Sequence, residues 1–177
     1  AAAKKPVFVY GKGITAGNSG DSLTALLNLT KMVDNASLLS VKGEANSLAA
    51  YLYNLDKPFE LNGQQAVYLA LGDDYPSKRL LQRLENAPFM AVQASYVSEA
   101  TAMADVVLPA EMWAEQEGHL LNLEGRLQTI QRGLTAPAEV RSNVEILESL
   151  AAQLDFSLNN DWEGQLKQRV SPNPIME

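Results

Sequence analysis

Two acidic side chains follow a strand-like run near the middle of the chain. Residues 65–71 are a short apolar run, and Gly72, Asp73 and Asp74 come directly after it. Ligands of open parallel sheets bind outside the carboxyl ends of the strands. The two carboxylates could accept hydrogen bonds from a guanine edge or a ribose, or cap the helix predicted to begin near Ser77. A metal site is disfavoured, because no further oxygen ligands recur at useful spacing.

A glycine-rich turn follows the first strand-like run. Gly11, Gly13 and Gly17 give the spacing GxGxxxG, one residue longer than the dinucleotide-binding fingerprint. The acidic residue expected after the second strand is replaced by Val41 and Lys42. The pattern therefore favours a tight turn over a nicotinamide or flavin site.

The remaining candidates for chemistry are isolated. His119 is the single histidine, and neither a cysteine nor a nucleophilic serine motif accompanies it. We interpret it as a loop histidine with a structural hydrogen bond, and Trp113 as an anchor that packs its segment onto the sheet. No catalytic residue and no metal ligand set is predicted.

These residues need elements to position them. Five strand-like runs alternate with helical patterns, at residues 6–10, 36–41, 65–71, 89–95 and 106–108. Such alternation implies a parallel sheet with helices on both faces. The predicted fold class is α/β, a three-layer, doubly wound, mainly parallel five-stranded Rossmann-like sheet.

The sheet should occupy residues 1–110. Residues 111–132 lack periodicity and predict a long irregular excursion after the fifth strand, and residues 139–154 return to a helical pattern. We expect residues 111–177 to pack on the same domain, which gives one domain overall, a fragment of a larger chain. Glu99 to Glu124 is an acidic run without lysine or arginine, either a solvated face or an interface for a basic partner.

Composition excludes several function classes. The 177 residues are 46% hydrophobic and 20% charged, with a formal charge of −7. This balance is typical of a soluble globular domain, and the acidity disfavours nucleic-acid binding. No run reaches the roughly 20 apolar residues of a membrane span. The absence of cysteine excludes disulfides and iron–sulfur ligation by this chain.

A more specific pattern surrounds the fifth strand. Residues 104–110 read Ala-Asp-Val-Val-Leu-Pro-Ala, residues 115–118 Glu-Gln-Glu-Gly, and residues 122–128 Asn-Leu-Glu-Gly-Arg-Leu-Gln. Upstream stand the Val-Gln pair at 92–93 and Ser-Glu-Ala-Thr at 98–101. In order and spacing these residues resemble the signature of the molybdopterin oxidoreductase superfamily, whose third, Rossmann-like domain this chain would match.

The sequence at 122–128 is similar to the form that this motif takes in one branch of the family, the branch that contains the large iron–sulfur subunit of bacterial NADH-quinone oxidoreductase. That resemblance implies a structural and interaction role in electron transfer, without a complete active site in this chain. Iron–sulfur clusters would lie elsewhere in the full protein. Partners would be the other domains of the subunit and other subunits of the respiratory complex. The location would be cytoplasmic and peripheral to the inner membrane.

Two departures concern the cofactor. Catalytic family members often carry Gly-x-Asn-Pro where this chain has Gly72-Asp73-Asp74-Tyr75-Pro76, and Asp where it has Ala94. The resemblance places these positions at the guanine end of the cofactor, and the loss of the Asp removes a hydrogen-bond acceptor. We therefore expect no cofactor in this domain.

Two alternatives remain open. One is the molybdopterin guanine dinucleotide-binding domain of a formate dehydrogenase-like molybdoenzyme. The other is an unrelated Rossmann-type nucleotide-binding protein. In the first alternative, the guanine nucleotide would contact six residues: Gly72, Asp73, Asp74, Gln93, Ser95 and Thr101.

Overall fold

The computed structural model describes residues 3–11, 14, 20–41, 44–55, 59–159 and 161–169. The chain divides into two units, one of residues 1–55, 121–127 and 172–177 and the other of residues 56–120 and 128–171. We call these unit 1 and unit 2. Gly13 and Gly17 of the predicted turn lie outside the described residues. The predicted packing of residues 111–177 onto 1–110 as one domain stays a prediction.

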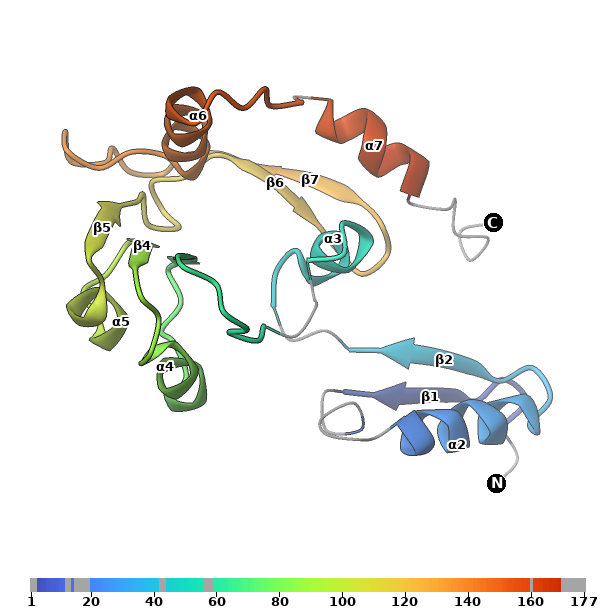
Figure 1. Cartoon of the computed structure of the whole chain (residues 1–177). Coiled ribbons are helices and arrows are strands. Elements are labelled where there is room, and N and C mark those ends of the chain that lie inside the picture. The colour runs from blue at the N-terminus through green and yellow to red at the C-terminus, as the bar shows by residue number, and fades with distance from the viewer. Residues whose placement is uncertain are drawn as a thin grey trace. The chain divides into compact units, whose positions relative to one another are not determined.

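Unit 1 contains a parallel strand pair. β1 (Val7–Tyr10) pairs with β2 (Ser37–Ser40), with Val7 opposite Ser37. Parallel neighbours need a crossover connection, and α2 (Gly20–Lys31) supplies it (Figure 1). The short helix α3 (Ser47–Leu52) follows β2. This order confirms the first two predicted strands and the helices after them.

Unit 2 contains a three-stranded parallel sheet. Its strands are β3 (Val67–Gly72), β4 (Met90–Ala94) and β5 (Val106–Pro109), in the order β3-β4-β5. The prediction of a single five-stranded sheet is not confirmed, since the described strands form two separate parallel ladders. The boundary between the units falls between β2 and β3.

Two short helices connect these strands. α4 (Lys78–Leu84) begins at Ser77, whose side chain accepts a hydrogen bond from the Leu80 amide at 3.2 Å. α5 (Glu99–Met103) begins after Ser98. Serine is favoured before a helix because its oxygen can satisfy an unpaired amide of the first helical turn, as Ser77 does. At α5 the Thr101 hydroxyl accepts from the Ser98 amide instead, and the Ser98 hydroxyl oxygen is buried without a hydrogen-bond partner in the described structure.

The core of unit 2 surrounds β4. Val92 is fully buried, and Met90 and Ala94 are also buried on this strand. Leu84 of α4 and Val67 of β3 complete the cluster. A central parallel strand is covered on both faces and therefore reads as a nearly continuous apolar run. The one polar residue within β4, Gln93, must find hydrogen-bond partners inside the protein.

The segment after β5 is more regular than the predicted excursion. β6 (Gly118–Leu121) and β7 (Leu127–Ile130) pair in a two-stranded sheet. Gly125 has a φ of 80°, which favours glycine at this tight connection. The predicted irregular excursion is therefore wrong for residues 118–130. The turn between the two strands has a local cause, because the Asn122 side chain accepts hydrogen bonds from the Glu124 and Arg126 backbone amides.

Two helices follow. α6 (Asn143–Gln153) lies within the predicted helix, and Ser142 and Glu145 form a reciprocal capping box at its start. Before α6, Ala110 forms a parallel bridge with Arg141, which ties this segment to the end of β5. α7 (Trp162–Arg169) was not expected from the sequence.

Candidate functional site

The six predicted ligand residues converge only in part. Gly72 ends β3 and lies opposite Ala94 of β4. The Ser95 amide donates to the Gly72 carbonyl at 2.9 Å. Parallel pairing thus brings Gly72, Asp73 and Ser95 to one end of the sheet, which we call the carboxyl edge. The φ of Gly72 is 55°, a conformation that favours glycine where the chain turns away from the strand.

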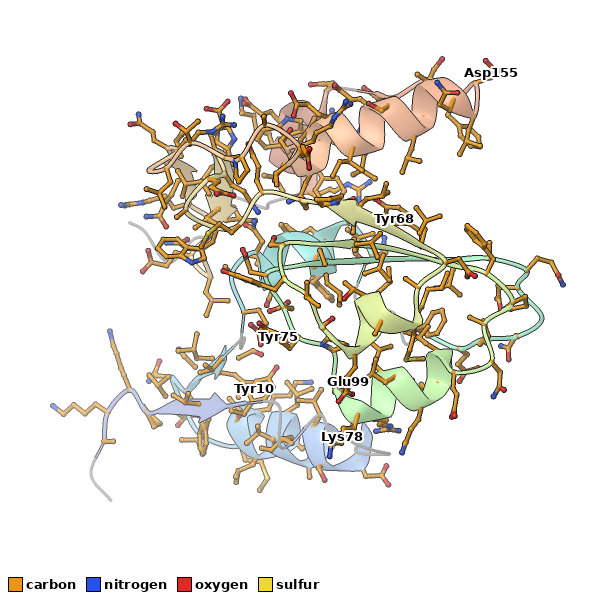
Figure 2. The ribbon with its side chains drawn as sticks, turned by 90° about the vertical axis from the view of Figure 1, so that its left-hand side faces the viewer. Tyr10, Tyr68, Tyr75, Lys78, Glu99 and Asp155 are labelled. Carbon is orange, nitrogen blue, oxygen red and sulfur yellow. The ribbon has the colours of Figure 1, made fainter. Side chains whose placement is uncertain are left out.

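Gln93 is bonded inside the protein. Its side chain is 2% exposed, accepts a hydrogen bond from the Tyr68 hydroxyl and donates one to Asn143 Oδ1. Figure 2 shows Tyr68 beneath α6, and burial raises the pKa of its hydroxyl. Three elements, β3, β4 and the start of α6, are therefore joined by one amide.

Ser95 and Thr101 are also engaged. Ser95 Oγ donates to the Glu111 carbonyl at 2.9 Å. Thr101 Oγ1 accepts from the Ser98 amide and donates to the Ser98 carbonyl, both at 2.8 Å. These hydroxyls hold the loop after β5 and the first turn of α5. Each hydroxyl already donates its hydrogen to a backbone carbonyl and cannot donate the same hydrogen to a nucleotide.

Asp73 differs from these residues. Its Oδ1 is buried and has no hydrogen-bond partner within the described structure. An unsatisfied buried acceptor costs about 1–3 kcal/mol. Close to it in sequence, Tyr75 stacks on Tyr96, with ring centroids 6.0 Å apart and planes 12° apart.

The fit of a guanine nucleotide to this edge is therefore poor. Asp73 offers an acceptor, but the Gln93 amide and the Ser95 and Thr101 hydroxyls already have partners in the protein. Guanine presents both hydrogen-bond donors and acceptors at its edges. The Gln93 amide and the Ser95 and Thr101 hydroxyls are the groups that could donate to the guanine acceptors, and they already donate to protein oxygens.

A second polar centre lies just past β5, and the sequence did not single it out. Glu111 is 4% exposed, although the acidic run around it suggested a solvated face or an interface. Its carboxylate pairs with Arg132 at 2.8 Å, and its backbone amide donates to the Arg141 carbonyl at 3.0 Å. Its carbonyl accepts from Ser95 and from the Gln116 amide. Glu111 thus fastens residues 116, 132 and 141 to the sheet.

A cavity of about 730 Å³ adjoins this ion pair. We call it the Glu111 cavity. Its wall includes Trp162 and the predicted structural histidine, His119, with ring centroids 4.9 Å apart and planes tilted by 51°. It is lined by residues from the segment between β5 and β6, from β6 and β7, from the two residues after β7, and from the starts of α6 and α7: Glu111, Gln116, Glu117, Gly118, His119, Thr129, Ile130, Gln131, Arg132, Ser142, Asn143, Val144, Glu145 and Trp162.

Glu145 carries a firm negative charge at this cavity. Hydrogen bonds from the Ser142 amide (2.9 Å) and the Ser142 hydroxyl (3.0 Å) lower the pKa of its carboxyl, and the positive charges of Arg141 and Arg132 contribute less.

The prediction that Trp113 anchors its segment onto the sheet is wrong, since that side chain is 70% exposed. An indole in a short turn after β5 has too little sheet within reach to be covered.

The described part of the chain has neither a metal-binding cluster nor a membrane-spanning helix. No group of three or more His, Asp or Glu side chains there could hold a metal ion. None of the helices described above is long and apolar enough to cross a membrane.

The chain is similar in sequence to one protein family and to subunits of known oxidoreductases. A family model for molybdopterin oxidoreductase matches residues 1–153. The G-type subunit of NADH-quinone oxidoreductase from Rickettsia felis is 25% identical over 96% of this chain and 26% of its own length. The α subunit of an F420-dependent formate dehydrogenase from Methanocaldococcus jannaschii is 35% identical over 45% of this chain and 12% of its own length. The chain thus spans about a quarter of the length of the NADH-quinone oxidoreductase relatives.

Proposed function

The chain belongs to the molybdopterin oxidoreductase family, and we propose that it is a structural and interaction domain of a large iron–sulfur subunit in an NADH-quinone oxidoreductase. The alignment over 96% of the chain to relatives named as a subunit of that complex supports this branch. In the proposed protein, iron–sulfur clusters belong to other parts of the subunit. The domain contacts those parts and neighbouring subunits on the cytoplasmic face of the membrane.

The observation that carries the proposal is the internal use of Gln93. A residue that could read a base instead joins β3, β4 and α6, and its side chain is 2% exposed. A cofactor-binding edge keeps such groups available for its ligand. The proposed role is therefore to hold shape and to make contacts, with no catalytic residue in this chain.

Calorimetric titration of the chain with GMP tests the absence of a guanine site. We expect no binding heat at millimolar nucleotide. Saturable heat that disappears in Asp73→Asn, but persists in the matched surface variant Asp155→Asn, would contradict the proposal.

Assembly is tested separately. The tagged chain is incubated with detergent-solubilised membranes of its source cell, and bound proteins are identified by mass spectrometry. Subunits of an NADH-quinone oxidoreductase should be enriched over a control with an unrelated acidic protein of similar size. Their absence would count against the interaction role.

The second candidate is the molybdopterin guanine dinucleotide-binding domain of a formate dehydrogenase-like enzyme. The partnerless Asp73 Oδ1 favours it, because a ligand donor would satisfy this oxygen. In this candidate the nucleotide contacts the residues Gly72, Asp73, Asp74, Gln93, Ser95 and Thr101. The third expectation, an unrelated nucleotide-binding protein, is wrong because the family match covers residues 1–153.

A further inference from the structure

The Glu111 cavity is a large hollow on unit 2, and its volume of about 730 Å³ lies within the range of about 300–1,000 Å³ typical of ligand sites. A single side chain would fill only part of it. The volume suits a short polypeptide segment or a compact organic ligand.

The charges that line the cavity are unbalanced. The lining residues include three glutamates, Glu111, Glu117 and Glu145, and one arginine, Arg132. Glu111 is buried and pairs with Arg132, and Glu145 accepts hydrogen bonds from Ser142 and lies within the field of Arg141. The exposed carboxylate of Glu117 therefore supplies the surplus negative charge to whatever enters.

The wall of the cavity is also aromatic. Trp162 is 39% exposed at the start of α7, and its ring meets that of His119 at a tilt of 51°. A guanidinium or ammonium over an indole face gains about 0.5–2 kcal/mol, depending on how far it is desolvated. The surplus carboxylate and the indole together favour a cation, and the planar guanidinium satisfies both.

We propose that the Glu111 cavity receives an arginine-bearing segment of a partner polypeptide. The guanidinium bonds to Glu117 and lies against Trp162, while the backbone of the segment occupies the remaining volume. Charge complementarity selects the partner, since the chain carries −7 overall and has no lysine or arginine from Glu99 to Glu124. The inference rests on the proposed function, because an interaction domain in a multi-subunit assembly needs such a contact.

The test uses the whole chain with Trp113→Phe, which leaves Trp162 as the single tryptophan. The probe is the peptide acetyl-Gly-Arg-Gly-amide, and the control is the same peptide with citrulline, which keeps the shape of arginine but lacks its charge. Trp162 fluorescence and the NMR signal of its indole N–H are followed during titration. We expect saturation with a Kd of about 1 mM and at least tenfold weaker binding of the citrulline peptide, a difference of about 1.4 kcal/mol.

Matched charge variants locate the contact. Glu117→Gln should weaken binding of the arginine peptide about fivefold or more, a loss of about 1 kcal/mol. Glu99→Gln removes the same charge from the start of α5 (Figure 2), a residue that does not line the cavity, and should leave the Kd unchanged. Equal binding of both peptides, no change in either signal up to about 20-fold above that Kd, or equal losses in the two variants would overturn the inference.

The result is separable from the proposed function. If the membrane-capture experiment recovers oxidoreductase subunits while the arginine peptide does not bind, the domain assembles through another surface and only the inference fails. If the peptide binds as expected and no such subunits are recovered, the cavity stands as a guanidinium site and the proposed assembly fails.

Discussion

The carboxyl edge of β3–β4–β5 and the Glu111 cavity use polar side chains in opposite ways. At the edge, the Gln93 amide and the Ser95 and Thr101 hydroxyls are bonded within the protein. At the cavity, the Glu117 carboxylate stays exposed beside the half-buried ion pair of Glu111 and Arg132. The sequence makes the edge look like the binding site, whereas the geometry leaves more charge and space at the cavity. Residue type at an expected position does not establish that the side chain is available.

Glu111→Ala should have the largest effect, because it removes the buried carboxylate that pairs with Arg132, while the backbone hydrogen bonds of residue 111 remain. Breaking a buried ion pair costs about 3–5 kcal/mol, and we expect about 3 kcal/mol because the exposed part of Arg132 can be solvated. The free energy of unfolding from urea titration measures it. Glu99→Ala is the surface control. A loss below about 1 kcal/mol would place Glu111 among ordinary surface acids.

Gln93→Leu tests the edge itself. It keeps most of the buried volume but leaves the Tyr68 hydroxyl without its acceptor and Asn143 Oδ1 without its donor, at a cost of about 2 kcal/mol. In the double variant with Tyr68→Phe, the total should fall short of the sum of the two single losses, since one interaction is removed twice. Strict additivity would mean that the Tyr68–Gln93 bond contributes nothing.

Ser142→Ala addresses the charge at the rim of the cavity. Loss of this cap should cost about 1 kcal/mol. The pKa of Glu145 is lowered by folding, so its contribution is present above the unfolded value of about 4.3 and is lost as pH falls through the lower folded value.

The pH dependence checks that sign. Urea titrations below about pH 4.3 should lose stability less steeply in Ser142→Ala than in the parent chain. Ser149→Ala is the control, because Ser149 lies on the same helix and its hydroxyl donates to the Glu145 backbone carbonyl instead of the carboxylate. An unchanged slope in Ser142→Ala would mean that the Ser142 hydroxyl does not contribute to the lowered pKa of Glu145, which the backbone amide of residue 142 would then explain alone.

Trp113→Phe should have the smallest effect. The indole is 70% exposed, and exposed substitutions usually change the free energy of unfolding by less than about 0.5 kcal/mol. Thermal and urea unfolding curves should superimpose on those of the parent chain. A loss above about 1 kcal/mol would restore the anchoring role that the sequence suggested.

The sequence predicted local features better than long-range ones. Strand and helix patterns located β1 to β5 and α6, and a serine located the start of α4, because each depends on neighbours within a few residues. The partners of Gln93 lie 25 and 50 residues away, and Glu111 pairs with Arg132, which lies 21 residues further along the chain. No local pattern signals such pairs.

The missed elements have similar causes. α7 contains a glycine and is otherwise mostly polar or charged, so its apolar face is too small to give a periodic signal. β6 and β7 are only four residues each, at the lower end of strand length. The division into two parallel ladders depends on which strands pair, and pairing is a property of the folded chain.

The bridge between Ala110 and Arg141 has a consequence for solubility. β5 is the outer strand of its sheet, and an unpaired outer strand is a template for aggregation. The bridge occupies the far end of this strand, where the Arg141 amide donates to the Pro109 carbonyl at 3.4 Å. Proline lacks an amide hydrogen and cannot extend a ladder. Because β5 is short, ends in a proline and has an arginine against its end, it offers another chain little to add to.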